Sequence, residues 1–193
     1  MTTIERRGHQ IRVLYSPETI ARRNEELATE ISGTAGSDLL VIAILKGSFV
    51  FAADLLRALY GAGLSPEVEF MSLSSYGAGT ESSGQVSVVR DVESDVSGRK
   101  VVLIDDILES GRTLAFAKDL LAARGATSVY TCVLLDKKGH RAANIDADFV
   151  GFECPDLFVV GYGMDVAHAF RELPFVGVVE GRVEDKSAET GES

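Results

Sequence analysis

Residues 39–45 form a continuous apolar run, Leu-Leu-Val-Ile-Ala-Ile-Leu. A run of this length without a polar residue is typical of a strand that is covered on both faces of its sheet. Shorter apolar or alternating runs, each bounded by polar or glycine-containing segments, predict further strands. These lie at residues 68–73, 85–90, 101–104, 129–135, 149–153, 158–161 and 175–179.

Helical periodicity fills several of the segments between these strands. Ser16 and Pro17 mark a helix start, with Ser16 as the N-cap and Pro17 at the first helical position. An apolar stripe from Ile20 to Ile31 continues that helix. Two further helices are expected at residues 49–60 and 113–124. Strands that alternate with helices predict an α/β fold, a mostly parallel sheet flanked by helices on both faces.

Residues 74–84 are polar and rich in glycine, and this loop precedes the predicted strand 85–90. Loops of this length and composition are either linkers or active-site lids. We therefore expect a mobile β-ribbon flap over about residues 74–97. The polar, charged residues 182–193 predict a disordered acidic tail, which leaves residues 1–181 as a single predicted domain.

The charge balance narrows the class of partner. A formal net charge of −10 and a pI near 4.8 argue against general binding to nucleic acid or to a membrane surface. Small anionic substrates stay possible, because one local site can be positive on an acidic protein. Cys132 and Cys154 lie far apart without metal-ligand spacing, so we expect buried free thiols in a reducing cytoplasm. The first residues lack an apolar signal core, which fits the same compartment.

The segment after the strand at 101–104 carries the most chemical information. Asp105 and Asp106 follow the strand, and a polar turn with Glu109, Ser110, Gly111, Arg112 and Thr113 precedes the next helix. Free backbone N–H groups at such a turn bind phosphate. The two carboxylates could hold hydroxyls or a hydrated magnesium ion beside it. The pattern favours a ribose-phosphate site, although strand–acid–turn–helix units are common and Ser110 or Thr113 could simply cap the helix.

Other polar residues follow neighbouring strands. Ligands of parallel α/β sheets bind at the carboxyl ends of the strands, where Lys46, Ser75 and Asp105 are predicted to converge. Lys46 together with Gly47 could bind pyrophosphate, because glycine lets the backbone approach a ligand closely. A lone lysine at a strand end is otherwise a solvated side chain.

Three separated motifs resemble one family. Residues 101–113 are similar to the phosphoribosyl-pyrophosphate signature of the type I phosphoribosyltransferases. Residues 44–56 and 149–174 resemble two further motifs of the hypoxanthine-guanine phosphoribosyltransferases within that family. The resemblance covers roughly residues 10–180, with the motifs in the expected order. It implies the type I fold, with a small hood formed by the terminal segments and a mobile flap.

The resemblance implies a role for each substrate-binding residue. Lys46 and Gly47 would bind pyrophosphate after a non-proline cis peptide bond, and Ser75 and Tyr76 would close over it from the flap. Asp105 and Asp106 would hold the ribose hydroxyls. The 5′-phosphate loop would be Glu109, Ser110, Gly111, Arg112 and Thr113. Arg171 would bind pyrophosphate, and magnesium would be the cofactor, near Asp105, Asp106 and Asp165.

The same resemblance implies a purine site. Lys137 would donate to the 6-oxo group, Phe158 would stack on the base, and the backbone of Val159 would contact its edge. Met164 and Asp165 would lie near the base. A cation that contacts a carbonyl rejects 6-amino purines, which present a donor there instead. The expected substrates are therefore hypoxanthine and guanine rather than adenine.

The chain departs from the commonest family pattern at one important position. Glu109 occupies the place where the family usually has an aspartate, the favoured general base near purine N7. Glu109 keeps the carboxylate but is longer by one methylene group. We expect it to be the catalytic residue of a purine-salvage enzyme that transfers phosphoribosyl to hypoxanthine and guanine.

Two alternatives keep the fold but change the function. One is a xanthine-guanine phosphoribosyltransferase, since the group that contacts the base around residues 159–165 does not settle the purine. The other is a non-catalytic regulator that senses nucleotides and binds RNA, against which the acidic charge argues. The resemblance also implies a homodimer or homotetramer, with the apolar helix at 49–60 as a possible interface.

Overall fold

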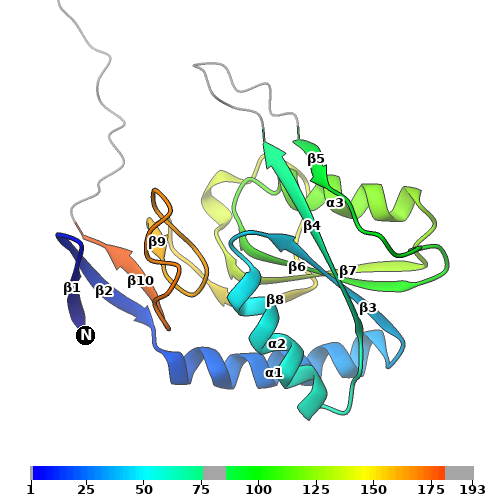
Figure 1. The fold of residues 1–193 in the computed structure, drawn as a ribbon, viewed down its shortest axis with the longest axis horizontal. Helices are drawn as coiled ribbons and strands as arrows, with labels where there is room; N and C mark the ends of the chain where they lie inside the picture. The colour runs from blue at the N-terminus through cyan, green and yellow to red at the C-terminus, as the bar shows by residue number, and fades with distance from the viewer. Residues whose placement is uncertain (1, 76–85, 181–193) are drawn as a thin grey trace, which may run out of the picture.

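The computed structural model describes residues 2–75 and 86–180, and a six-stranded sheet forms its centre (Figure 1). The strand order is β5-β4-β3-β6-β7-β8, and β5 alone runs antiparallel to its neighbour. The strands are β3 (Leu39–Leu45), β4 (Glu67–Ser75), β5 (Val86–Arg90), β6 (Lys100–Leu108), β7 (Ser128–Asp136) and β8 (Phe149–Glu153). The predicted mostly parallel sheet is confirmed.

Helices cover both faces of this sheet, as Figure 1 shows. The apolar side chains of α1 (Pro17–Ala35) and α2 (Phe49–Gly61) pack on one face, with Val41, Ala43 and Val102 among the strand residues beneath them. The side chains of α3 (Arg112–Ala123) pack on the other face. Adjacent strand residues point to opposite faces, so the uniformly apolar β3 contributes to both layers.

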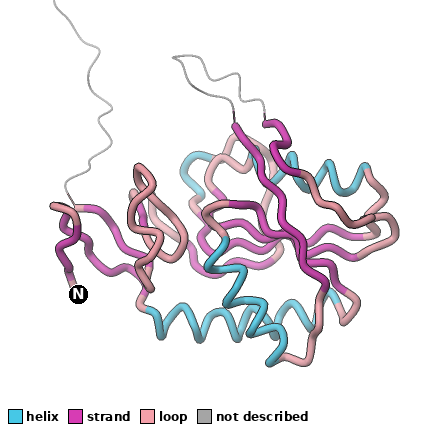
Figure 2. Tube along the Cα trace, in the orientation of Figure 1, coloured by secondary structure: helices cyan, strands magenta, loops and turns pink. Residues whose placement is uncertain are grey.

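A second, antiparallel sheet lies beside the main one and is built from both ends of the described chain (Figure 2). Its order is β1-β2-β10-β9, formed by β1 (Thr3–Arg6), β2 (His9–Tyr15), β9 (Val159–Val160) and β10 (Val176–Val179). This small sheet is the expected hood. A short 3-10 turn, η1 (Lys138–His140), follows β7.

Most predicted elements are confirmed, with boundaries that differ in informative ways. Ser16 caps α1 as expected, and its side chain accepts a hydrogen bond from the Thr19 backbone N–H at 3.3 Å. The strand expected to end at residue 104 continues to Leu108, because β7 pairs with it that far. Gly111 is the N-cap of α3, and the Ser110 hydroxyl accepts a long hydrogen bond, at 3.4 Å, from the backbone N–H of Arg112 at the start of that helix. The hairpin of β1 and β2 was not predicted.

The flap is described in part. β4 and β5 form the expected antiparallel ribbon, with Ser75 opposite Val86. Residues 76–85 and the predicted tail at 182–193 lie outside the described residues, so the flap's mobility, the tail and the single-domain boundary stay predictions. Within residues 2–75 and 86–180, none of the helices has the length and apolar character needed to cross a membrane.

Candidate active site

A cavity of about 410 Å³ opens at the carboxyl ends of β3 and β6. Polar residues from three segments line it: the turn after β3, the end of β6, and the loop between β6 and α3. Eight of the predicted site residues border it, namely Lys46, Gly47, Asp105, Asp106, Glu109, Ser110, Gly111 and Thr113. Of the residues predicted to converge, Lys46 and Asp105 therefore border one cavity, and Ser75 ends β4, the strand next to β3.

Lys46 and Gly47 reach the cavity through an unusual backbone path. The Leu45–Lys46 peptide bond is cis, as the family resemblance implies. Gly47 then packs against Asp106 so closely that a Cβ atom at position 47 would lie 1.7 Å from Oδ2 of Asp106. Any side chain at position 47 would therefore force the Asp106 carboxylate or the turn to shift, since real Cβ atoms do not approach other atoms so closely.

The two adjacent acids are in different environments. Asp105 is 7 % exposed, and its Oδ1 accepts a hydrogen bond from the Asp106 backbone N–H at 3.0 Å. Burial raises the pKa of Asp105 well above its ordinary value, and the nearby Asp106 carboxylate raises this pKa further. Asp106 accepts from the Ile107 backbone N–H at 3.0 Å. A cation or hydroxyl donors bound here would favour the ionised form of Asp105.

Glu109 and Lys137 directly follow the neighbouring strands β6 and β7, and their side chains form an ion pair. Nζ of Lys137 lies 3.8 Å from Oε1 of Glu109, and the lysine side chain is 8 % exposed against 42 % for the glutamate. The Lys137 backbone N–H donates to the Leu108 carbonyl at 2.9 Å, which fixes the lysine beside the end of β6. A buried ammonium is thus held next to a carboxylate that borders the cavity, while Lys137 itself does not line it.

The loop that follows β9 packs against the turn after β3. A Cβ atom at Gly163 would lie 2.2 Å from the Gly47 carbonyl oxygen, so the two backbones are in direct contact. Arg171 donates from Nη1 to the Gly163 carbonyl at 2.6 Å, and its Nη2 lies 2.5 Å from Oδ1 of Asp165. Met164, which lies between Gly163 and Asp165 in the sequence, is buried. The predicted pyrophosphate-binding arginine is therefore close to the predicted pyrophosphate turn.

The remaining predicted residues are placed less closely around the cavity. Phe158 and Val159 lie at β9 in the hood, where Phe158 packs against that sheet's apolar cluster. Arg112 is exposed and does not border the cavity. Ser75 is the last residue of β4, and Tyr76 lies outside the described residues.

Comparison with known proteins decides the family. The phosphoribosyl transferase domain family matches residues 13–167. A hypoxanthine-guanine phosphoribosyltransferase of Aquifex aeolicus (strain VF5) is 44 % identical over 178 residues, which cover 91 % of this chain and 98 % of the relative. The chain belongs to the phosphoribosyltransferase family.

Solved structures agree with this assignment of the phosphoribosyltransferase fold. The crystal structure of a hypoxanthine phosphoribosyltransferase from Staphylococcus aureus has a TM-score of 0.82 at 38 % identity, over 87 % of this chain and 90 % of that one. A hypoxanthine phosphoribosyl transferase from Trypanosoma cruzi has a TM-score of 0.83 at 36 % identity, with the same coverage. The family and the fold predicted from the motifs are confirmed.

Magnesium is the implied cofactor of this phosphoribosyltransferase, and carboxylates near the cavity are its candidate ligands. Among the described residues, no three His, Cys, Asp or Glu side chains gather into a complete metal-ligand set. Mg²⁺ at phosphate substrates typically takes only one or two carboxylates and completes its shell with phosphate oxygens and water. Asp105 and Asp106 at the cavity fit that mode. Asp165 is already engaged, because it contacts Arg171 and accepts from the His168 backbone N–H at 2.8 Å.

Two phosphoribosyltransferase residues near the site were missed from the sequence. His140 borders the cavity, and its Nε2 lies 2.7 Å from Oδ2 of Asp156. Arg141 donates to the backbone carbonyl of Glu109 at 3.0 Å. Both follow Asp136-Lys137-Lys138, which reads as an ordinary polar strand end. The short distance in sequence from Lys137 was the only signal that could have drawn attention to them.

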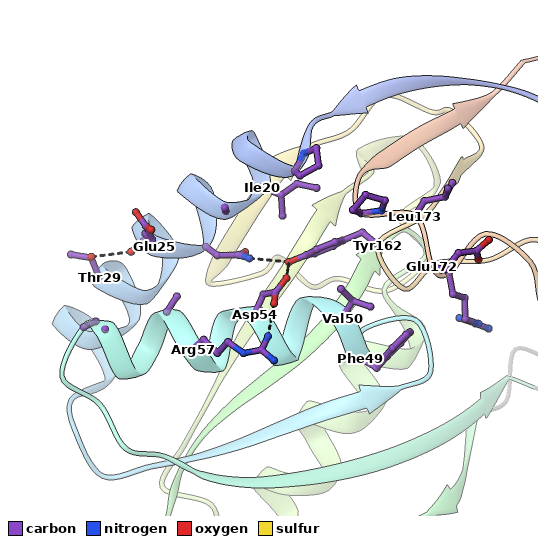
Figure 3. Close-up of a pocket in the computed structure, with 18 residues that line it drawn as sticks. Ile20, Glu25, Thr29, Phe49, Val50, Asp54, Arg57, Tyr162, Glu172 and Leu173 are labelled. Carbon is purple, nitrogen blue, oxygen red and sulfur yellow. Dashed lines mark hydrogen bonds and ion pairs between the residues drawn. The ribbon is translucent and has the colours of Figure 1, made fainter. Parts of the chain in front are cut away.

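A second, larger cavity of about 1050 Å³ lies between α1, α2 and residues 171–174 (Figure 3). Tyr162 spans part of its wall, where its hydroxyl donates to Oδ2 of Asp54 at 2.8 Å and accepts from Nδ2 of Asn24 at 3.0 Å. Burial and the Asp54 carboxylate raise the pKa of Tyr162, so its hydroxyl stays protonated as a donor. Among the described residues, Oδ1 of Asn24 is buried without a hydrogen-bond partner.

Proposed function

We propose that this phosphoribosyltransferase is a purine-salvage enzyme that transfers the phosphoribosyl group of phosphoribosyl pyrophosphate to hypoxanthine and guanine. The products are the nucleoside monophosphate and pyrophosphate. The observation that carries the choice of purine is the pair of Lys137 and Glu109, 3.8 Å apart. The 6-oxo oxygen and N7 lie on the same edge of a purine ring, so one residue pair at this spacing suits both atoms.

Each half of the substrate has candidate groups around the 410 Å³ cavity. The backbone N–H groups of residues 110–113, at the start of α3, suit the 5′-phosphate. Asp105 and Asp106 suit the ribose 2′- and 3′-hydroxyls, which would donate to the carboxylates. Lys46, which borders this cavity, suits the pyrophosphate, and so does Arg171, which borders the neighbouring 1050 Å³ cavity and donates to the Gly163 carbonyl beside Gly47. Holding both ends of phosphoribosyl pyrophosphate would orient ribose C1 for attack.

The reaction replaces one bond at ribose C1. The purine attacks C1 through N9 while the bond from C1 to pyrophosphate breaks, and positive charge develops on the ribose ring. Glu109 accepts the proton from purine N7 through its carboxylate, which leaves a neutral base in the product. Lys137 donates to the 6-oxo oxygen, which orients the base and stabilises the electron density that returns to the ring as N7 loses its proton. Stabilisation of this kind is mainly electrostatic and positional.

Magnesium is the proposed cofactor. Asp105 and Asp106 would hold it together with the substrate, and it would neutralise charge on the departing pyrophosphate. Asp165 is proposed for a second ion. Its carboxylate contacts Arg171 here, so binding of Arg171 to pyrophosphate would release it for that role.

The quaternary state is proposed to be a homodimer or homotetramer. Phe49 is 44 % exposed and Tyr60 is 76 % exposed, both on α2, and Phe49 borders the 1050 Å³ cavity. An exposed apolar helix face next to a groove suits burial by a second copy. The Trypanosoma cruzi relative was studied for how its C-terminal region affects its oligomeric state and enzymatic activity. Light scattering of the protein and of Tyr60→Glu tests this, and a monomer of unchanged size in both would contradict it.

We also propose a cytoplasmic location, on the evidence of the cysteine residues. Cys132 and Cys154 are both free and buried, which suits a reducing compartment.

Pyrophosphate release from phosphoribosyl pyrophosphate tests the function directly. With magnesium present, hypoxanthine, guanine, xanthine and adenine are compared as acceptors. Turnover with hypoxanthine and guanine but not with adenine is expected. Faster turnover with xanthine would keep the reaction and overturn the purine assignment. No turnover with any base, despite tight binding of phosphoribosyl pyrophosphate, would favour a regulatory protein of the same fold.

A further inference from the structure

We propose that Arg141 is a positioning residue that holds Glu109 in place for proton transfer. This inference rests on the proposed function, since it concerns the carboxylate assigned as the base. Arg141 does not border the 410 Å³ cavity, so it would act through Glu109 and not on the substrate.

The guanidinium of Arg141 joins two elements of the site. Nη1 donates to the backbone carbonyl of Glu109 at 3.0 Å, and Nη2 donates to Oδ1 of Asp136 at 2.5 Å. Asp136 is the last residue of β7 and is 5 % exposed, while the Arg141 side chain is 18 % exposed. A charged pair this buried is screened little by solvent, so it is a firm anchor.

The same segment holds the next residue of the phosphate loop as well. The backbone N–H groups of Ala142 and Ala143 donate to the Ser110 carbonyl at 2.8 and 3.0 Å. The Arg141 side chain also packs beneath Gly111, where a Cβ atom would lie 3.3 Å from Cδ of Arg141 and 2.7 Å from Cγ2 of Ile145. Residues 141–145 therefore support the loop at successive carbonyls.

Glu109 is held at its backbone carbonyl and at its carboxylate, and both contacts depend on the consecutive residues Asp136 and Lys137 at the end of β7. Asp136 anchors Arg141, which holds the Glu109 backbone, and Lys137 pairs with the Glu109 carboxylate. A glutamate has one more rotatable bond than an aspartate, so its carboxylate is placed less firmly by the backbone alone. The Glu109 carboxylate is therefore placed by the contact of Arg141 with its backbone together with the ion pair to Lys137.

Arg141→Lys separates the two contacts. Lysine keeps a charge for Asp136, but its single ammonium does not reproduce the planar fork that reaches both partners. We expect kcat for hypoxanthine to fall about tenfold and the KM for phosphoribosyl pyrophosphate to change by less than about twofold. Arg124→Lys is the matched control, because Arg124 makes a two-armed contact with Asp91 at 2.7 and 2.6 Å away from the cavity. We expect its kcat to match that of the unmodified protein.

A double-mutant cycle with Glu109→Gln distinguishes positioning from general support of the fold. If Arg141 acts through the Glu109 carboxylate, Arg141→Lys should lower kcat by less than about twofold once the carboxylate is absent. Amide hydrogen exchange over residues 109–113 should be faster in Arg141→Lys than in the unmodified protein and unchanged in Arg124→Lys. Arg141→Met combined with Asp136→Asn, which leaves no buried carboxylate unpaired, should show the same kcat loss.

The outcomes separate this inference from the function on which it rests. Turnover by the unmodified protein together with an unchanged kcat in Arg141→Lys would overturn the role of Arg141 and leave the proposed function standing. An equal loss of kcat from Arg141→Lys with and without the Glu109→Gln substitution would also overturn it. Absence of turnover in the unmodified protein would overturn the proposed function, and the positioning of a base would fall with it.

Discussion

Nζ of Lys137 lies 3.8 Å from Oε1 of Glu109, with the lysine side chain 8 % exposed and the glutamate 42 % exposed. The cation is thus fixed within the protein, while its partner carboxylate reaches toward the cavity. A buried ammonium loses hydration and gains from any acceptor that comes within reach. This asymmetry suits a lysine that donates to a bound carbonyl and a glutamate that exchanges a proton with substrate.

Replacement of Lys137 tests how the purine is selected. Lys137→Gln should lower kcat/KM for hypoxanthine by roughly 10- to 150-fold, because hydrogen bonds to charged groups contribute about 1.5–3 kcal/mol. Lys138→Gln is the matched control, since Lys138 is 63 % exposed and pairs with Glu153 at the surface. Steady-state kinetics of both variants measure the effect. Equal losses in the two variants would remove Lys137 from the purine site.

Replacement of Glu109 tests the assignment of the base. Glu109→Gln should lower kcat about 100-fold or more, the usual contribution of general base catalysis. The affinity for phosphoribosyl pyrophosphate, measured by calorimetry, should stay within about threefold, since the cavity's phosphate and ribose groups are untouched. Glu109→Asp keeps a carboxylate and should retain far more activity than Glu109→Gln. An equal loss of kcat and of substrate affinity would instead assign Glu109 a binding role.

The sequence predicted the central layers because their signals are local. The apolar run at 39–45 and the Ser16 cap depend on neighbouring residues alone, and both appear as expected. The end of β6 was placed too early because Asp105 and Asp106 interrupt the apolar run. The strand continues because Ile107 and Leu108 pair with Leu135 and Asp136 of β7, a partner distant in sequence.

Long-range contacts also explain the features that the sequence did not reveal. β1 reads Thr-Ile-Glu-Arg and has no apolar run, and it pairs with β2, which in turn pairs with β10 from the other end of the chain. The approach of Gly163 to Gly47 joins segments more than a hundred residues apart. Arg141 carries no periodic signal, so its contact with Glu109 is visible only in the fold. The motifs predicted eight of the residues that border the cavity, but not what holds them there.

The raised pKa of Asp105 predicts a pH dependence of stability in the metal-free protein. The folded pKa lies above the unfolded value, so the folded state binds the proton more tightly. Stability from this group is fully present below the unfolded pKa of about 3.9 and is lost as the pH rises through the folded pKa. Asp105→Asn removes that loss. In EDTA it should melt above the unmodified protein at pH 8, by roughly 2–4 °C for each kcal/mol gained.

The same variant should show the functional cost of that stability. At pH 4 and below, the melting temperatures of Asp105→Asn and the unmodified protein should converge. The affinity of Asp105→Asn for phosphoribosyl pyrophosphate with magnesium should fall, because this variant lacks one carboxylate of the proposed ribose site. Asp119→Asn, on an exposed position of α3, is the control for loss of one charge. A melting difference that is constant from pH 4 to pH 8 would contradict the assignment to Asp105.

The contact of Gly47 with Asp106 predicts a sharp effect of one methyl group. A Cβ atom at position 47 would lie 1.7 Å from Oδ2 of Asp106, so Gly47→Ala must displace either the turn or the carboxylate. Both belong to the proposed phosphoribosyl-pyrophosphate site, and a shift of about 1 Å can cost on the order of 100-fold in rate. We expect weaker binding of phosphoribosyl pyrophosphate and a lower kcat.

Gly33→Ala is the control, because a Cβ atom there has open space within α1. That variant should keep full activity and melt higher, since alanine stabilises a helix interior by about 1 kcal/mol over glycine. Full activity in Gly47→Ala would show that the turn and Asp106 can separate without loss, and would remove this contact from the site.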